Sequence, residues 1–184
     1  TPMTNVLEVE TPIHAPRADV FAVLRGVEGY ERYSDYVTGV ARDGDGGPGT
    51  EYAVTLSWWR LTYTARFRIT DLDPPERIEW ELVKDLDARA AWHLEPVEVD
   101  DPDVDDATRL VVTARYDPDT ADHGALSLPR LVPMAAVVAR ARPFVEREAE
   151  HVLARVVADL EGAPRRVRLD VRIRRDVDRD EGGR

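Results

Sequence analysis

The chain has 184 residues, of which 43% are hydrophobic, and this composition is typical of one globular domain with a sizeable core. It contains no cysteine, so disulfides, thiolate metal sites and cysteine nucleophiles are excluded. Its formal net charge is −11, which argues against a general nucleic-acid-binding surface.

The kinds of charged and apolar residues indicate where the protein works. Lys84 is the only lysine, so arginine supplies the rest of the 25 basic residues. An acidic excess with scarce lysine resembles proteins of salt-loving cytoplasms, although high-GC coding alone also produces a preference for arginine. No apolar run approaches the roughly 18 residues of a membrane span, and no signal-peptide pattern opens the chain. We expect a cytoplasmic, halophilic protein without a transmembrane segment, and leave transient membrane contact open.

The first part of the chain predicts a strand followed by two short helices. Residues 6–13 alternate between apolar and polar side chains, which is a strand pattern. Residues 18–24 form a short amphipathic helix bounded by a proline and a glycine. A second short helix is expected over residues 27–34, where Tyr30 and Tyr33 are three positions apart and share a face.

Six more strands are expected after these helices, at the spacing of consecutive hairpins. Their side chains alternate, so one face of each strand is covered and the other is wet. In the longest of them, for example, Tyr63 and Phe67 share the apolar face. The six expected strands span residues 36–41, 50–59, 60–72, 77–83, 88–97 and 109–116.

The loop expected over residues 42–49 contains a literal G-x-G-x-x-G pattern at Gly44, Gly46 and Gly49. A dinucleotide-binding motif of this kind leads from a strand into a helix. Here a strand follows instead, and Pro48 interrupts the pattern. The loop is therefore interpreted as a hairpin connection.

A long helix is expected over residues 131–160, because apolar residues recur there in steps of three and four. Pro143 lies inside this pattern and has no amide hydrogen, so a kink or a short break is expected at that point. Gly162 and Pro164 end the helix. The apolar stripe that should be buried consists of Leu131, Met134, Val138, Ala141, Val145, Ala149, Val152, Val156 and Leu160.

This order of elements resembles the helix-grip fold of the START-like superfamily, also called the Bet v 1-like or SRPBCC superfamily. Within it, the chain is most similar to the polyketide cyclase/dehydrase and coenzyme Q-binding START group over about residues 5–161. The similar segments are I-H-A-P at 13–16, V-F-A-V-L at 20–24, V-E-G-Y-E-R-Y at 27–33 and L-D-P-P-E-R-I at 72–78. The resemblance implies an α+β fold in which a curved antiparallel sheet wraps around a long C-terminal helix, with two short helices between the first two strands.

A charged extension follows the expected domain, which spans residues 1–164. In residues 165–184, Val167, Leu169, Val171 and Ile173 alternate with charged residues, as in a strand. An added edge strand, or a frayed charged tail, is the first interpretation. The alternative is a basic arm that contacts an acidic partner or nucleic acid.

The resemblance also implies a hydrophobic cavity between sheet and helix, open near the first half of the helix. Family members bind lipids, quinones, polyketides or hormones there. The inward-facing aromatic residues either fill a solid core or form the wall of such a cavity. The tyrosines of the second short helix either rim its mouth or dock that helix on the sheet. The candidate cavity residues are Tyr30, Tyr33, Trp58, Tyr63, Phe67, Trp80, Trp92, Tyr116, Met134 and Val138.

The pattern of titratable residues favours binding over catalysis. The histidines show no metal-ligand spacing, the aspartates of residues 100–106 lack the EF-hand pattern, and the inward faces hold almost no carboxylates. We expect a binding or carrier protein, without a cofactor, for an apolar small molecule such as a lipid, an isoprenoid quinone or a polyketide. Two alternatives stay open: a cyclase/dehydratase-type enzyme that uses cavity tyrosines or His123, and a protein-interaction module associated with a ribosome or a chaperone.

Overall fold

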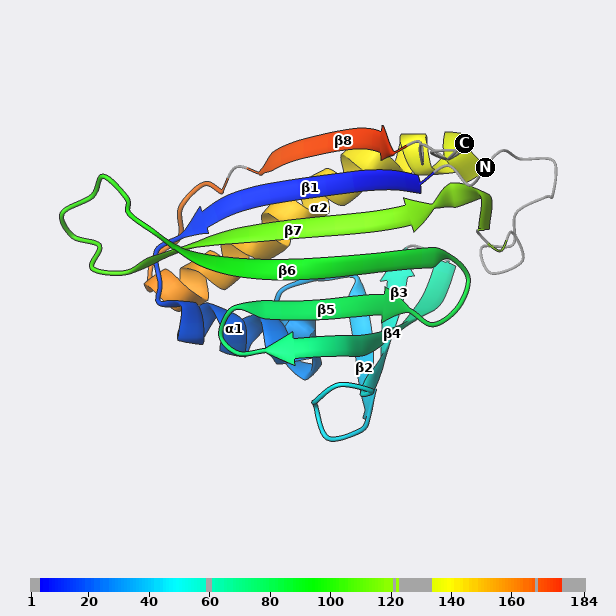
Figure 1. Cartoon of the computed structure of the whole chain (residues 1–184), viewed down its shortest axis with the longest axis horizontal. Coiled ribbons are helices and arrows are strands. Elements are labelled where there is room, and N and C mark those ends of the chain that lie inside the picture. The colour runs from blue at the N-terminus through cyan, green and yellow to red at the C-terminus, as the bar shows by residue number, and fades with distance from the viewer. Residues whose placement is uncertain (1–3, 59–60, 121, 123–133, 168, 177–184) are drawn as a thin grey trace, which may run out of the picture.

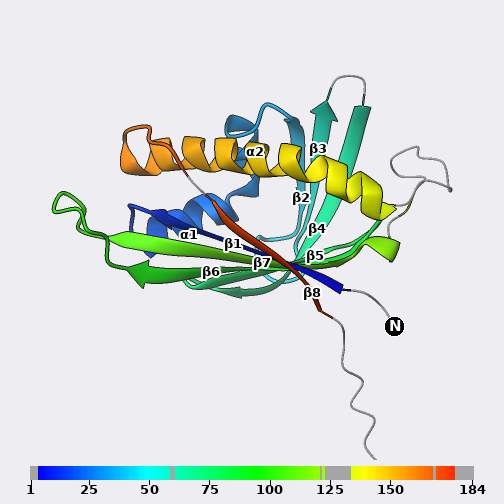
Figure 2. The same ribbon diagram turned by 90° about the horizontal axis from the view of Figure 1, so that it is seen from above.

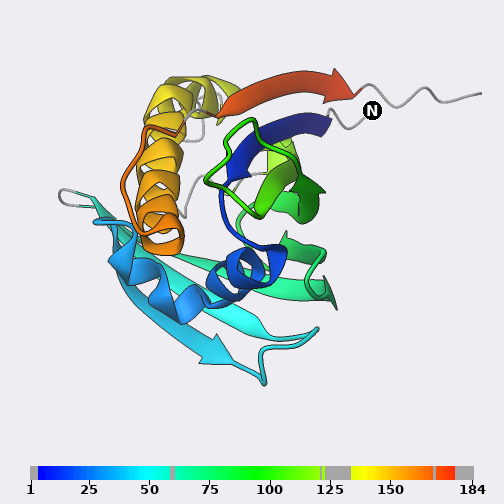
Figure 3. The ribbon, with the colours of Figure 1, turned by 90° about the vertical axis from the view of Figure 1, so that its left-hand side faces the viewer.

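A curved antiparallel sheet wraps around one long helix, α2 (Met134–Glu161), as Figures 1 and 2 show. The computed structural model describes residues 4–58, 61–120, 122, 134–167 and 169–176. Seen from the end, the sheet surrounds α2 on one side (Figure 3). The strands are β1 (Thr4–Ile13), β2 (Val37–Asp43), β3 (Glu51–Trp58), β4 (Leu61–Asp73), β5 (Arg77–Leu82), β6 (Asp87–Val97), β7 (Ala107–Asp117) and β8 (Asp170–Asp176).

The order of the strands in the sheet is β2-β3-β4-β5-β6-β7-β1-β8. Strands β2 to β7 follow one another as antiparallel neighbours, and β1 joins at the far side, antiparallel to β7. The chain crosses from β1 to β2 through α1 (Arg17–Arg25) and the 3₁₀ helix η1 (Val27–Arg32). A second short 3₁₀ helix, η2 (Pro118–Thr120), follows β7. This arrangement confirms the predicted helix-grip fold.

Helix α1 is held between the sheet and α2 by its apolar side. Val20, Phe21 and Leu24 are buried, at positions that share one side of a helical turn. The helix ends at Gly26, whose amide donates to the carbonyl of Ala22. The turn into η1 follows at once, so both short helices close the same end of the space under the sheet.

The core is centred on the concave face of the sheet. Ile13, Ile69 and Ile78 are completely buried there, and Val157 of α2 meets them from the helix side. The ring of Trp80 lies between two other aromatic rings. Their centroids are 5.9 Å away for Tyr52 and 5.5 Å away for Trp92. Burial of this kind is the main favourable contribution to folding.

The long helix differs from its prediction in two respects. It continues through Pro143 without the break that was left open. The predicted stripe is also wrong at two positions, because Ala141 is exposed and Val145 is 57% exposed. The spacing identified the helix correctly, but burial also needs an opposing surface, and α1 and η1 lie against the second half of α2 (Figure 2). Val157, which the stripe omitted, is completely buried there.

The alternating segment after α2 forms a strand at the edge of the sheet. Strand β8 pairs antiparallel with β1, from Thr4 opposite Asp176 to Glu10 opposite Asp170. Val167 precedes it and is buried in the core, and the guanidinium of Arg165 donates to the carbonyl of Pro12 at 2.8 Å. The first part of the extension is therefore bound to the rest of the fold.

Candidate ligand-binding cavity

An apolar cavity of about 280 Å³ lies between the sheet and the second half of α2. Strands β6 and β7 form its floor, α2 covers it, and α1 and η1 close one end. We call this space the apolar cavity. Its lining consists of Val23, Leu24, Tyr30, Tyr33, Trp92, Leu110, Val112, Ala149, Val152, Leu153 and Val156.

The periodicity of each element explains why these side chains meet. Leu110 and Val112 are two residues apart on β7 and therefore point to the same face, and Val112 is paired with Trp92 of β6. On α2, residues 149, 152, 153 and 156 follow the steps of three and four that define one helix face. Both patterns are visible in the sequence, but only the fold brings them to opposite sides of one space.

Among the described lining residues, the polar side-chain atoms are two phenol hydroxyls and the indole nitrogen of Trp92, and both hydroxyls are already engaged. Tyr30 donates its hydroxyl hydrogen to the carbonyl of Leu24, and Tyr33 donates to Oδ2 of Asp159 at 2.7 Å. Burial raises the pKa of both tyrosines, and at Tyr33 the hydrogen bond to the Asp159 carboxylate raises the pKa further. Both phenols are therefore protonated at neutral pH, and their protons are held by the protein.

Polar contacts fasten the segment after η1 to α2 along one side of the apolar cavity. Ser34 Oγ donates to Glu148 at 2.9 Å, and Arg155 donates to the carbonyl of Tyr33 at 3.1 Å. Arg155 also forms an ion pair with Asp35 at 3.1 Å, which lowers the pKa of that exposed carboxyl group. These contacts hold the wall that carries Tyr33 against α2.

Only some of the predicted cavity residues line the apolar cavity. Tyr30, Tyr33 and Trp92 line the apolar cavity. Phe67 and Trp80 belong to the packed core, where Trp80 is only 7% exposed.

The other predicted residues lie elsewhere or cannot be placed. Tyr63 donates to Asp85 at 2.7 Å, and Tyr116 is half-buried on β7. The side chains of Trp58, Met134 and Val138 lie outside the described residues, as does His123, the histidine considered for catalysis.

Several lining residues were not predicted as site residues. Leu24 was assigned only to its short helix, and Leu110 and Val112 only to the strand expected over residues 109–116. The prediction favoured aromatic side chains, whereas aliphatic residues form most of this lining. For the strand residues, the alternation of apolar and polar side chains was the signal. Alternation alone, however, does not distinguish a cavity wall from a filled core.

The described residues offer little for acid–base or metal chemistry. No group of three or more His, Cys, Asp and Glu side chains within the described ranges is placed to hold a metal ion. No described helix is both long and apolar enough to cross a bilayer. The described lining of the apolar cavity contains no carboxylate and no imidazole. The geometry therefore suits the enclosure of an apolar group better than proton transfer.

Solved structures share this fold at low sequence identity. TTHA0849 from Thermus thermophilus is 15% identical, with a TM-score of 0.64 over 85% of this chain and 97% of that one. The aromatase/cyclase Zhui from Streptomyces sp. R1128 is 22% identical, with a TM-score of 0.61 over 86% of this chain and 94% of that one. The di-domain aromatase/cyclase StfQ of the steffimycin biosynthetic pathway is 14% identical, with a TM-score of 0.63, and 85% of this chain corresponds to 51% of that protein.

The sequence itself identifies the family. Comparison with curated proteins gives no match. Residues 5–161 match the family described as polyketide cyclase / dehydrase and lipid transport, and this match includes every element from β1 to the end of α2. The chain therefore belongs to the polyketide cyclase/dehydrase and lipid transport family.

Proposed function

We propose that this protein binds an apolar small molecule, such as a lipid, an isoprenoid quinone or a polyketide, in the apolar cavity. The observation that carries the proposal is the chemistry of the lining. It is aliphatic and aromatic, and the hydroxyl hydrogens of Tyr30 and Tyr33 are both donated to protein oxygens. A ligand in this space gains contact with apolar surface, and no charged group among the described lining residues has to lose its water.

The volume supports a ligand of limited size, or one end of a longer ligand. Sites for small molecules commonly enclose about 300–1,000 Å³, and the cavity of about 280 Å³ is just below this range. Trp92 offers a broad aromatic surface for a ring or a chain. A flat ring system or a segment of an acyl or isoprenoid chain matches this shape.

Catalysis of the cyclase or dehydratase type is the second candidate. It is favoured by the family description and by the two structural neighbours that are named as aromatase/cyclases. Against it stands the absence of carboxylate and imidazole groups from the described lining, together with the raised pKa values of both cavity tyrosines. A general acid or base works best when its pKa lies near the working pH.

The acidic composition supports a further part of this proposal, which is that the protein works in a salt-rich cytoplasm. The net charge of −11 creates repulsion between like charges that dissolved salt screens.

Titration with N-phenyl-1-naphthylamine, a neutral fluorescent probe, tests the binding proposal. We expect saturable fluorescence enhancement by the wild-type protein. Val112→Glu should abolish it, because the variant places a carboxylate in the lining. Val111→Glu is the matched control, since Val111 is the neighbour on the opposite face of β7 and should leave binding intact.

A second measurement identifies the natural ligand and separates the two candidates. Native mass spectrometry of protein purified from its own host should show a co-purifying apolar molecule. Conversion of that molecule on incubation would establish the cyclase or dehydratase alternative. Lack of saturable binding, together with a macromolecular partner in place of a ligand, would refute the binding proposal.

A further inference from the structure

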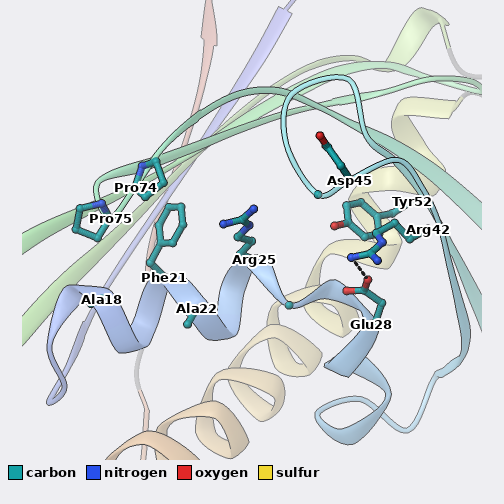
Figure 4. A pocket seen from close by; sticks show the side chains of 12 residues that line it. Ala18, Phe21, Ala22, Arg25, Glu28, Arg42, Asp45, Tyr52, Pro74 and Pro75 are labelled. Atoms are coloured by element: carbon teal, nitrogen blue, oxygen red, sulfur yellow. Dashed lines mark ion pairs between the residues drawn. The ribbon is translucent and has the colours of Figure 1, made fainter.

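A second concave space, of about 650 Å³, lies on the other side of α1. It is bounded by that helix, by the loop between β2 and β3, and by the turn between β4 and β5 (Figure 4). We call this space the charged pocket. Ala18, Phe21, Ala22 and Arg25 line it from α1, at the spacing of one helix face. Val23 and Leu24 face the apolar cavity instead, so α1 separates two different spaces.

Two guanidinium groups converge in the charged pocket. A side-chain carbon built on Gly46 would lie 3.6 Å from Nη2 of Arg25 and 4.0 Å from Nη1 of Arg42. Gly46 itself has a φ of +92°, a conformation that favours glycine, and its missing side chain leaves this space open. Figure 4 shows Arg25 projecting from α1 between Phe21 and Tyr52. Two cationic side chains from different elements, α1 and β2, are thereby close enough to contact the same group of a ligand.

The carboxylates of the charged pocket already have partners. Glu28 forms an ion pair with Arg42 at 3.0 Å. Asp45 accepts a hydrogen bond from the amide of Gly47 at 2.8 Å, within its own loop. The guanidinium of Arg25, by contrast, has no hydrogen bond or ion pair to any other described residue. Its guanidinium is therefore free to pair with a ligand anion that enters the charged pocket.

The remaining walls of the charged pocket are apolar and flat. Phe21 and Tyr52 contribute aromatic rings at its two ends, and Pro74 and Pro75 lie beside Phe21 (Figure 4). Burial and the nearby Glu28 carboxylate raise the pKa of the Tyr52 phenol, while the positive charges of Arg42 and Arg25 act in the opposite direction. Both guanidinium groups are therefore close enough to Tyr52 to act on it electrostatically.

We propose that the charged pocket is a second ligand site, distinct from the apolar cavity, and that it takes an aromatic monocarboxylate. The carboxylate group pairs with the guanidinium of Arg25, whose planar donors match two carboxylate oxygens. The aromatic part lies against Phe21 and the prolines. A dianion such as phosphate suits the pocket less well, because Arg25, Arg42, Glu28 and Asp45 have formal charges that already cancel.

The test is a titration of ¹⁵N-labelled protein with 2-naphthoate, followed by nuclear magnetic resonance, with N-phenyl-1-naphthylamine present to occupy the apolar cavity. We expect saturable shifts of the Arg25 side-chain Nε–H signal and of the Gly26 and Gly46 amide signals. The neutral analogue 2-naphthamide should shift them much less. Arg25→Gln should weaken binding by about 10- to 100-fold, the range for loss of a charged hydrogen-bonding group.

Arg147→Gln provides the matched control, because Arg147 is exposed on α2 and removal of its guanidinium changes the net charge equally. Binding should be unchanged in this variant. Equal binding of 2-naphthoate and 2-naphthamide, equal losses in the two variants, or shifts confined to residues outside the charged pocket would each overturn the proposal. The result is independent of the apolar cavity, since Val112→Glu should abolish binding of the neutral probe and leave 2-naphthoate binding intact.

Discussion

The two sides of α1 face spaces of opposite chemistry. Leu24 faces the apolar cavity, where the described hydroxyl groups are already bound to protein. Arg25, the next residue, faces the charged pocket, where its guanidinium has no described partner. Successive residues of a helix point about 100° apart, so one residue step is enough to change the space that a side chain enters. Neighbours in the sequence can therefore serve different sites.

A line of aromatic rings connects the two spaces. Tyr52 lines the charged pocket, Trp92 lines the apolar cavity, and Trp80 packs between them. Trp80 is buried among protein atoms, whereas one side of Trp92 faces the cavity. The comparison predicts that these two tryptophans contribute differently to stability and to binding.

The largest effect is expected from Trp80→Ala. Removing a large side chain from a filled core costs about 3–5 kcal/mol, since burial is lost and a void remains. Trp92→Ala should cost less, because one side of its ring has no protein contacts to lose, but it should reduce binding of N-phenyl-1-naphthylamine. Denaturant unfolding and probe titration of both variants measure this difference.

Trp80→Phe is the control for this experiment. The indole Nε1 of Trp80 is buried without a hydrogen-bond partner among the described residues, and such a donor destabilises the folded state. The phenylalanine variant keeps an aromatic ring and removes this donor, so it should be far more stable than the alanine variant. Equal losses of stability for Trp80→Ala and Trp92→Ala would contradict the distinction between core and cavity wall.

A smaller effect is expected at alkaline pH, where the tyrosines of the two spaces ionise. Burial raises the pKa of Tyr30 and of Tyr52. At Tyr52 the Glu28 carboxylate raises the pKa further, but Arg42 and Arg25 oppose the rise, and no arginine does so at Tyr30. Because the folded-state pKa values lie above the unfolded value of about 10, both phenols stabilise the fold below that pH, and this stabilisation is lost as the pH rises further.

The order of ionisation is the measurable outcome. We expect Tyr52 to ionise before Tyr30, which is detected by comparing the ultraviolet absorbance of tyrosinate in Tyr30→Phe and Tyr52→Phe. Tyr30→Phe should also reduce the alkaline loss of stability more than Tyr52→Phe. The reverse order would show that the arginines do not influence the charged pocket as the geometry indicates.

Salt is expected to have the smallest of the three effects predicted here, and it should act differently on ligand binding in the two spaces. The screening length falls from about 10 Å at 0.1 M to about 3 Å at 1 M salt. Binding of 2-naphthoate should therefore weaken a few-fold in molar potassium chloride, whereas binding of the neutral probe should not weaken.

The melting temperature of the protein should rise in the same salt series, because screening reduces repulsion within a chain of net charge −11. An unchanged melting temperature across the salt series would remove the proposal of a salt-rich environment.

The fold was predictable because its signals are local and repeated. Alternation located each strand of the sheet to within a few residues, and steps of three and four located α2. The failure at Val145 shows where such reasoning ends, since a periodic pattern cannot reveal how far the covering elements extend along a helix. For the same reason, the alternating pattern placed Trp80 and Trp92 on the inward face of the sheet, but it could not predict which of them would line a cavity.

The charged pocket could not be predicted from the sequence. Arg25 and Arg42 are separated by a whole short helix and most of a strand, and no motif connects them. The glycine pattern at residues 44–49 drew attention to the loop, but as a possible nucleotide motif. The actual importance of Gly46 is the open space beside its backbone, and this space exists only once α1 is packed against the sheet.

The pairing of β8 with β1 also determines how the molecule behaves toward copies of itself. Without β8, strand β1 would present a row of free backbone donors and acceptors, which is a template for aggregation with another chain. Strand β8 occupies those groups and places Asp170, Arg172 and Arg174, all exposed and charged, at the outer border of the sheet. Charged border strands of this kind oppose further strand addition, so the segment after α2 protects the protein from edge-to-edge association at high concentration.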